Sequence, residues 1–292
     1  MGGALKGILK NSSPDLSKLD GHREDTKEEM KKPKLIITVT PNPSWIYPET
    51  KNHPTSPEEI ADAVYNCYRA GASIAHIHAP GRQMETCKRI RDKCDIIVQL
   101  GLSGDSLAKR RSLFEARPDM MSIILTHHDE QFTRDSFNVL HEKPELEEYG
   151  SLCLKYNVKP EFEVWHLGAF WNLAHLENRG MVKKPHFLTI FFGWPGGSWS
   201  PPTADEFYHR LRYLPEDSIY STSVMDPRQT ELLLLAIANG GHVRVGTEDY
   251  PFLNENVLAE DNAALVARIA RIAREAGREI ATPKDARMMI GI

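Results

Sequence analysis

Two histidines separated by one residue, His76 and His78, stand near the end of a short apolar stretch over residues 73–79. Because side chains of a β-strand alternate between its faces, the two imidazoles of a His-x-His pair point the same way. Imidazole is a common ligand of divalent metals, so the pair could hold one ion. The same pair could also be satisfied by hydrogen bonds at a polar strand end, and the rest of the chain decides between the two.

A second reactive stretch lies over residues 242–249, where a predicted strand is followed by Glu248 and Asp249. A catalytic zinc site uses three protein ligands and keeps one position open. His76, His78 and Glu248 fit this plan if both strands belong to one closed barrel, because their ends then meet. The alternative is that the two carboxylates cap a helix or form a solvated pair.

The second stretch also carries Arg244, whose charge is costly inside a barrel unless it is paired. Asp249, Glu163 or an anionic substrate could supply the partner. The alternative is an outward-pointing Arg244, where the covering helices make a charge awkward too. We predict that Arg244 pairs with Asp249 and that Asp249 acts as the base towards the substrate.

Glu161 and Glu163 are two residues apart and share one face of a predicted strand over residues 160–164. On the inward face they could orient a ligand or relay a proton, and we predict a catalytic role for Glu163. On the outward face they would be surface charges, and Phe162 and Val164 would fill the barrel. The period of two fixes the pairing but not the face, so both alternatives stay open.

The elements that must position these groups alternate as strand and helix from residue 34 onward. Buried, often β-branched runs predict the strands, and capping patterns such as Ser56-Pro57-Glu58-Glu59 predict the helix starts between them. The strands are expected at residues 35–39, 73–79, 96–100, 120–125, 160–164, 186–192, 218–224 and 243–245.

These eight strand–helix units predict a (β/α)8 TIM barrel as a single domain over residues 34–292. A doubly wound open sheet would need a Gly-rich turn after the first strand, and residues 40–43 read Thr-Pro-Asn-Pro instead. Residues 1–33 form a polar extension, which could hold a short amphipathic helix around residues 25–32.

Active residues of such barrels gather at the carboxyl ends of the strands. Beyond the groups above, Gln99, Ser103 and Thr126 lie at or just after these ends, and we predict that they bind the substrate. His127 and His128 could add a ligand, but we expect them to begin a polar loop.

The composition excludes several classes of protein. The chain has 292 residues, of which 41% are hydrophobic, and a formal net charge of −4 with a pI near 6.3, so no basic surface indicates nucleic acid. No apolar run approaches the roughly 20 residues of a membrane span, and the N-terminus lacks a secretory signal pattern. The four cysteines are scattered, which is typical of reduced thiols in a cytoplasmic protein.

The order of these motifs resembles that of the β-keto acid cleavage enzymes, formerly a domain of unknown function. The matching segments span nearly the whole chain after the extension: residues 54–60 (Pro-Thr-Ser-Pro-Glu-Glu-Ile), 70–78 (ending in His-x-His), 160–163 (Pro-Glu-Phe-Glu), 167–168 (Leu-Gly) and 236–249 (ending in Arg-Val-Gly-Thr-Glu-Asp). The last motif is specific, and together with His-x-His it makes coincidence a poor explanation.

The resemblance implies a zinc-bearing (β/α)8 enzyme with acetyl-CoA as co-substrate. Such an enzyme condenses a β-keto acid with acetyl-CoA, cleaves the adduct in a retro-Claisen step, and releases acetoacetate and a new acyl-CoA. The family's metal ligands match His76, His78 and Glu248, and its catalytic pair matches Arg244 and Asp249. We also predict a homo-oligomer, either a dimer or a tetramer.

The chain departs from the family pattern in three loops. Residues 101–104 read Gly-Leu-Ser-Gly where the family has Ser/Thr-Thr-Gly-Gly, residues 165–169 read Trp-His-Leu-Gly-Ala, and the loop after His78 is short. These loops lie on the substrate and CoA side, so we predict a substrate preference unlike the family's usual one. Two alternatives remain: a metal-dependent hydrolase or lyase acting on a small carboxylate without CoA, and a non-catalytic keto-acid binder.

Overall fold

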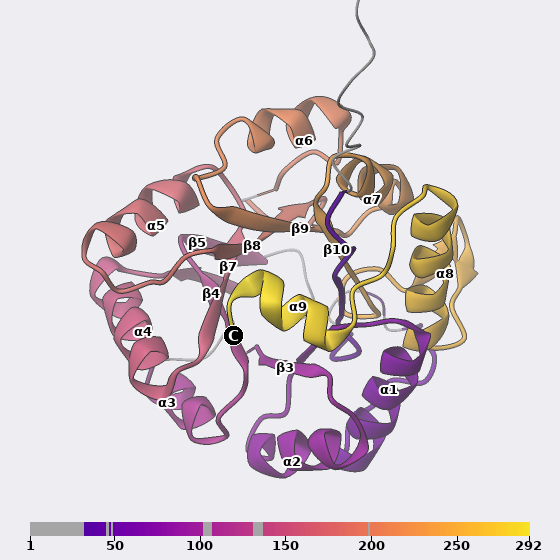
Figure 1. The fold of residues 1–292 in the computed structure, drawn as a ribbon, viewed down its shortest axis with the longest axis horizontal. Helices are drawn as coiled ribbons and strands as arrows, with labels where there is room; N and C mark the ends of the chain where they lie inside the picture. The colour runs from indigo at the N-terminus through magenta and orange to yellow at the C-terminus, as the bar shows by residue number, and fades with distance from the viewer. Residues whose placement is uncertain (1–31, 45–46, 48, 102–106, 131–136, 198) are drawn as a thin grey trace, which may run out of the picture. The chain divides into compact units, whose positions relative to one another are not determined.

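The computed structural model describes residues 32–44, 47, 49–101, 107–130, 137–197 and 199–292. Eight parallel strands close into a barrel in the order β1-β10-β9-β8-β7-β4-β3-β2, which confirms the predicted (β/α)8 fold (Figure 1). The barrel strands are β1 (Ile37–Val39), β2 (Ile74–Ile77), β3 (Ile97–Leu100), β4 (Met120–Ile124), β7 (Lys159–Val164), β8 (His186–Phe192), β9 (Ser218–Val224) and β10 (His242–Val245). The predicted extension lies outside the described residues except for Lys32 and Pro33.

Eight helices surround the barrel in the described part of the chain, one after each strand (Figure 1). They are α1 (Pro57–Ala70), α2 (Gln83–Lys93), α3 (Leu107–Glu115), α4 (Lys143–Tyr156), α5 (Gly168–Asn178), α6 (Ala204–Leu211), α7 (Gln229–Ala238) and α8 (Asn262–Glu275). The predicted capping box is present, because the Ser56 side chain accepts from the backbone of Glu59 and the Glu59 carboxylate accepts from the backbone of Ser56. Helix α1 therefore begins where its sequence predicts.

The outward faces of the strands build the main hydrophobic core against the helices. Phe162 and Val164 of β7 belong to this core, together with Leu173 and Leu176 of α5. Because neighbouring side chains alternate, the two glutamates of β7 face the barrel interior. The inward alternative for Phe162 and Val164 is therefore wrong.

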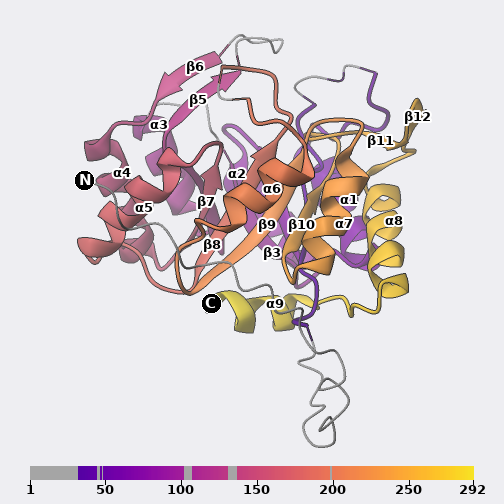
Figure 2. The ribbon, with the colours of Figure 1, turned by 90° about the horizontal axis from the view of Figure 1, so that it is seen from above.

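The amino-terminal end of the barrel is closed by a helix that the sequence analysis did not predict, α9 (Pro283–Ile290). Ala286 and Ile290 of α9 form one buried apolar cluster with inward residues at the starts of the strands, which are Ile36, Ile74, Ile97, Met120 and Phe187. Figure 2 shows α9 at the opposite end from the strand pairs β5–β6 and β11–β12. Only the carboxyl end of the barrel is thus left for a polar site.

Two small antiparallel sheets lie at that carboxyl end: β5 (His127–Glu130) with β6 (Phe137–Leu140), and β11 (Phe252–Asn254) with β12 (Val257–Leu258). The loop predicted at His127 and His128 is wrong, because these residues pair with Leu140 and Val139 in a hairpin. The strand that pairs with these histidines, β6, lies further along the chain. The polar composition around His127 and His128 therefore did not indicate that they form a strand.

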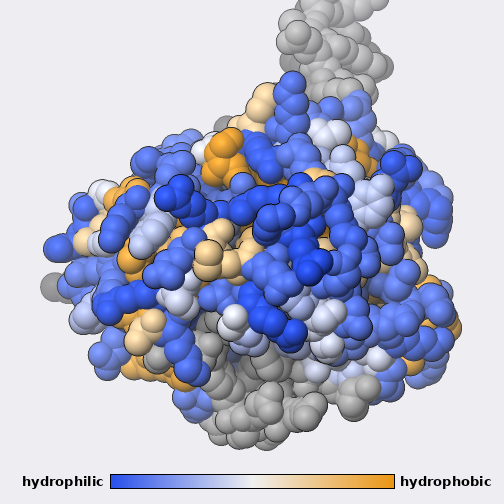
Figure 3. Space-filling view, turned by 90° about the horizontal axis from the view of Figure 1, so that it is seen from below, coloured by the Kyte–Doolittle hydropathy of each residue, from blue (hydrophilic) through white to orange (hydrophobic). Residues whose placement is uncertain are grey.

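The helical surface shown in Figure 3 is mostly hydrophilic, with small scattered apolar patches. Ion pairs join α1 to α2 on this part of the molecule, with Glu58 contacting Arg89 and Lys93, and Asp62 contacting Lys93. Among the described residues, no helix has the length and apolar character needed to cross a membrane.

Candidate metal centre and active site

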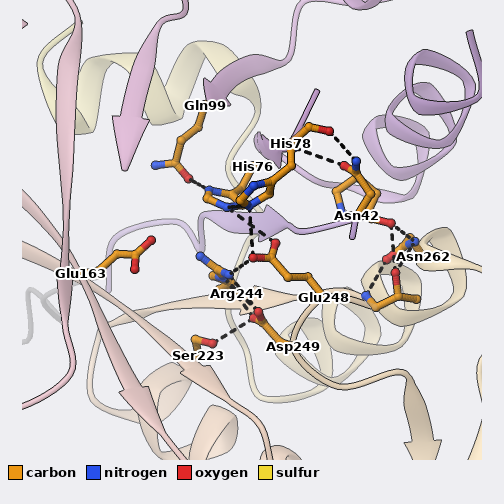
Figure 4. A network of polar contacts seen from close by, with 12 residues as sticks. Asn42, His76, His78, Gln99, Glu163, Ser223, Arg244, Glu248, Asp249 and Asn262 are labelled. Atoms are coloured by element: carbon orange, nitrogen blue, oxygen red, sulfur yellow. Dashed lines mark hydrogen bonds and ion pairs between the residues drawn. The ribbon is translucent and has the colours of Figure 1, made fainter. Parts of the chain in front are cut away.

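Three buried side chains with metal-ligating atoms meet at the carboxyl end of the barrel (Figure 4). His76 lies in β2, His78 follows it, and Glu248 follows β10 across a turn of two residues. Nε2 of His76 and Nε2 of His78 are 3.0 Å apart, and the Glu248 carboxylate is 3.6 Å from the first and 3.4 Å from the second. The three ligand atoms lie within 4.8 Å of one another, so the residues predicted to bind zinc are brought together.

The donor set suits a divalent ion of the zinc type. Two imidazoles and one carboxylate leave a fourth position open in tetrahedral coordination. Oε2 of Glu248 is buried and accepts no hydrogen bond, as expected of an atom kept for another partner. The observed geometry therefore fits the group that the sequence predicts.

Neighbouring side chains hold the two imidazoles in place. His76 donates from Nδ1 to Oε1 of Gln99 over 2.8 Å, which leaves Nε2 as the lone-pair nitrogen. Asn42 donates to the backbone carbonyl of His78 over 2.6 Å. Gln99 was predicted to bind substrate, and the structure places its carbonyl oxygen against His76, while its Nε2 has no hydrogen-bond partner.

Gly101 ends the strand next to this pair and lies very close to it. A Cβ atom at this position would be 2.4 Å from Cε1 of His76 and 2.9 Å from Nε2 of His78. A side chain here would therefore displace the imidazoles. The family usually has a hydroxyl-bearing residue at this position. In this chain the position is Gly101, and its packing against His76 and His78 leaves no room for a side chain.

The charges of the three ligands are strongly linked. Burial opposes protonation of His76, but the adjacent Glu248 outweighs it and raises the pKa of His76. Burial lowers the pKa of His78. Burial disfavours the Glu248 carboxylate, yet His76, Arg244 and His78 hold its pKa well below the usual range. Glu248 therefore stays ionised beside the two imidazoles, which suits the binding of a cation.

We call His76, His78 and Glu248 the metal-ligating group, because their side chains could hold a metal ion. Arg244 and Asp249 form a buried ion pair beside this group (Figure 4). The guanidinium donates through Nε to Oδ2 over 3.0 Å and through Nη2 to Oδ1 over 2.9 Å. Nη2 also lies 3.2 Å from Oε1 of Glu248, and Ser223 donates to Oδ2 of Asp249 over 2.9 Å. Arg244 points into the barrel, so the outward alternative is wrong.

Burial and the neighbouring charges have opposite effects on the pKa values of Asp249 and Arg244. Burial raises the pKa of Asp249, and Arg244 only partly offsets it. Burial opposes the charge of Arg244, but Asp249 and Glu248 raise its pKa overall. Asp249 is therefore a stronger base than an ordinary aspartate, while Arg244 stays a cation.

Glu163 lies across the barrel mouth from the metal-ligating group (Figure 4). Its Oε2 accepts from Nε1 of Trp165 over 3.2 Å, and within the described part of the chain no hydrogen bond or ion pair joins it to the Arg244–Asp249 pair. Trp165 stacks on Phe191 with ring centroids 4.9 Å apart, and the guanidinium of Arg244 lies 5.0 Å from the Phe191 ring centroid. Trp165 and Phe191 thus form an aromatic wall beside Glu163 and Arg244.

Glu161 lies one inward position below Glu163 and is fully enclosed. Burial and the charge of Glu163 raise its pKa from 4.5 to about 7, against the opposing effect of Arg244. Its Oε2 has no hydrogen-bond partner. The barrel interior thus holds a carboxyl group that is close to half protonated at neutral pH.

The remaining predicted substrate residues have mixed outcomes. Thr126 follows β4 and is buried, with an Oγ1 that has no hydrogen-bond partner, so its hydroxyl is available to a ligand. Ser103 lies outside the described residues. Neither substrate role is tested by the structure.

Sequence reasoning missed two residues that support the site, Ser223 and Asn42, and it considered a third, Trp165, only as part of a loop that sets the substrate preference. Ser223 donates to Asp249, Asn42 donates to the His78 backbone and Trp165 donates to Glu163. Ser223 and Trp165 each lie two residues after a residue of their strand that faces the barrel interior. Because side chains of a strand alternate between its faces, the sequence could have indicated that both face the interior. Asn42 lies in a loop, where no periodic signal exists.

Comparison with known proteins agrees with this geometry. The sequence model of the beta-keto acid cleavage enzyme family matches residues 34–292, and the chain belongs to this family. It is 32% identical over 277 residues to 3-keto-5-aminohexanoate cleavage enzyme of Fusobacterium nucleatum subsp. nucleatum, covering 89% of this chain and 98% of that protein.

Two further relatives extend the comparison. The 3,5-dioxohexanoate:acetyl-CoA acetone transferase of Paraburkholderia graminis is 27% identical, over 89% of this chain and 96% of its own length. The structure of ObcA in a ternary complex with a C4-CoA adduct and oxalate aligns with a TM-score of 0.69 at 17% identity, covering 82% of this chain and 68% of that chain. The latter likeness concerns the fold alone.

Proposed function

We propose that this enzyme transfers the acyl part of a β-keto acid to CoA, with acetyl-CoA as the second substrate and zinc as the cofactor. The observation that carries the proposal is the meeting of His76, His78 and Glu248 with the Arg244–Asp249 pair at one barrel end. The family match and the relative named as an acetyl-CoA acetone transferase support acetyl-CoA as the co-substrate.

His76, His78 and Glu248 would hold the zinc ion, with Gln99 fixing the tautomer of His76. When bound, zinc supplies Lewis-acid chemistry, polarising the keto and carboxylate oxygens of the substrate. The aromatic wall of Trp165 and Phe191 limits the access of water to that region.

Asp249 would take the proton from C2 of the keto acid. Its buried carboxylate is a stronger base than a solvated one, and it is already oriented by Arg244 and Ser223. Arg244 would meet the substrate carboxylate, since its Nη1 is buried without a hydrogen-bond partner. As Arg244 turns to the substrate, Asp249 loses part of its counter-charge and becomes a still stronger base.

The reaction balances without an oxidant or a further reactant. The C2 carbanion forms a bond to the thioester carbonyl of acetyl-CoA, and the CoA thiolate moves to the original keto carbon. The bond between C2 and that keto carbon then breaks, C2 regains a proton, and acetoacetate leaves beside the new acyl-CoA.

An isotope experiment tests this proposal. The protein is incubated with zinc, acetyl-CoA labelled with ¹³C in both acetyl carbons, and a panel of β-keto acids, and the products are analysed by mass spectrometry. The proposal predicts that both labelled carbons appear in acetoacetate and that the new acyl-CoA is unlabelled. Labelled acetate, or consumption of the keto acid without CoA, would indicate a hydrolase or lyase instead. No turnover with any keto acid would leave only a binder.

Zinc itself, the homo-oligomeric state and the cytoplasmic location remain predictions from the sequence. The described cysteines are all free thiols, as expected for a reducing compartment. Sedimentation analysis of the purified protein would distinguish a dimer or tetramer from a monomer.

A further inference from the structure

A separate cavity of about 270 Å³ adjoins the metal-ligating group on its outer side. Asn42 and His78 line its buried end, and Thr55 and Arg82 line its exposed end. Figure 4 shows Asn42 on the side of His78 that faces away from Glu163. Because His78 belongs both to the metal-ligating group and to the cavity wall, a ligand in this cavity would end beside the predicted zinc site.

The wall of this cavity is apolar and lacks a carboxylate. Half of the residues that line it are apolar, and the others are neutral polar residues, histidines or an arginine; the apolar residues are Pro43, Pro54, Pro57, Ile60, Ala79 and Pro80. Arg82 at the exposed end donates from Nη2 to the backbone carbonyl of Thr55 over 3.3 Å. No acidic residue lines this cavity, so its wall holds no carboxylate to neutralise the charge of Arg82. A ligand with an uncharged chain and an anionic outer end would match this surface.

A neighbouring cavity of about 500 Å³ has the opposite character. It shares His53 and Pro54 with the first cavity, but Glu59, Asp62 and Asp261 line it. These carboxylates would repel a phosphate group. The two cavities therefore offer a matched pair, alike in position and opposite in charge.

We propose that the carboxylate-free cavity receives the pantetheine arm of acetyl-CoA, with Arg82 facing the CoA phosphates. This inference rests on the proposed function, which supplies acetyl-CoA as the ligand. The pantetheine arm is long, narrow and uncharged, so it suits the proline-rich wall. Its thioester end would reach the side of His78, where the keto acid is activated.

Two substitutions, one in each cavity, test this assignment. Thr55→Trp places a large side chain at the exposed end of the carboxylate-free cavity, and Asn66→Trp places the same side chain in the acidic one. Both positions are exposed, so neither change disturbs the core. Each variant is compared with the wild type for zinc content, for the KM of each substrate and for the affinity of acetyl-CoA by calorimetry.

Thr55→Trp is expected to raise the KM for acetyl-CoA and its dissociation constant by about tenfold or more, because it removes binding that ground and transition state share. The KM for the keto acid and the zinc content should not change. Arg82→Glu should act in the same direction through its reversed charge. Asn66→Trp should behave as the wild type.

The outcomes separate the cavity assignment from the proposed function. If acetyl-CoA supports turnover but Thr55→Trp and Asn66→Trp both match the wild type, the cavity assignment is wrong and the function stands. If the wild type and Asn66→Trp bind acetyl-CoA, Thr55→Trp does not bind it, and none of the proteins turns it over, the assignment stands and the function is wrong. If the wild type neither binds nor uses acetyl-CoA, both are wrong.

Discussion

The two ends of the barrel interior are built from the same strands but differ in almost every physical respect. At the amino end, Ile74 of β2 packs under α9 in an apolar cluster. Two residues further along the same strand, His76 lies in a group of buried charges with unpaired polar atoms nearby. The first arrangement stabilises the fold, and the second costs stability and is useful only with a ligand. Along β2, stability and chemistry are thus separated by about 7 Å, the rise of two residues.

The largest effect should come from breaking the buried pair at the polar end. Asp249→Asn is expected to lower kcat by about 10²-fold or more, since it removes the general base, while zinc content stays intact. Arg244→Ala should also raise the KM for the keto acid, because it removes a carboxylate contact. Steady-state kinetics with metal analysis on the same samples measures both.

The double variant tests whether the pair acts as a unit. Residues that act together have non-additive effects, so the double variant should be little worse than the poorer single one. Multiplying losses, or near-full kcat in Asp249→Asn, would rule out this pair, and Glu163 would become the next candidate base.

The apolar end should respond in the opposite way. Ile74→Ala is expected to lower the free energy of unfolding by about 2 to 5 kcal/mol, because it leaves a cavity under α9. The KM values and zinc content at 25 °C should match the wild type. Chemical denaturation measures the stability, and Ile74→Val serves as a milder control with a loss of about 1 kcal/mol. A loss of zinc without a loss of stability would show that the two ends are not separate.

A smaller effect is expected from Glu161, a carboxyl group enclosed between the two ends. Its pKa is raised to about 7, so between 4.5 and 7 the folded protein holds a proton that the unfolded chain releases. Stability must then fall as pH rises through this window. The groups that act on Glu161 are Glu163, Arg244, His76 and Thr189, and the Glu161→Gln change leaves all four in place.

Glu161→Gln should therefore stabilise the metal-free protein by about 1 to 3 kcal/mol at pH 8 and by much less at pH 5. Denaturation curves of both proteins across this range measure the difference. An equal effect at both pH values would show that Glu161 does not titrate in this range in the folded protein.

The sequence predicted the barrel because each of its strands and covering helices has a local signal. The apolar runs of the strands and the capping box at Ser56 and Glu59 follow from neighbouring residues, and the structure has both. The hairpin at His127 and the place of α9 under the barrel depend on partners far along the chain. The face of Glu161 was open for the same reason, since only packing against α5 decides it.

The meeting of His76, His78 and Glu248 was predictable from the sequence, but the contacts around them were less so. His76, His78 and Glu248 lie at or just after the carboxyl ends of β2 and β10, and a closed barrel brings such strand ends together. The contact of Gln99 with His76 and the close approach of Gly101 depend on the register of neighbouring strands, which no local pattern shows. A Gly101→Ser change would restore the hydroxyl usual for the family, but a side chain there would move both imidazoles. Its effect on substrate preference is meaningful only if zinc is retained.

The metal content of the purified protein tests the central claim most directly. Zinc is measured by inductively coupled plasma mass spectrometry in the wild type and in His76→Ala, with circular dichroism to verify the fold. We expect about one zinc ion per wild-type chain, as for a single site with three ligands, and almost none in the variant, which remains folded. A wild type without zinc when grown in zinc-supplemented medium, or a variant that retains its full zinc content, would contradict the assignment of His76, His78 and Glu248 as the metal centre.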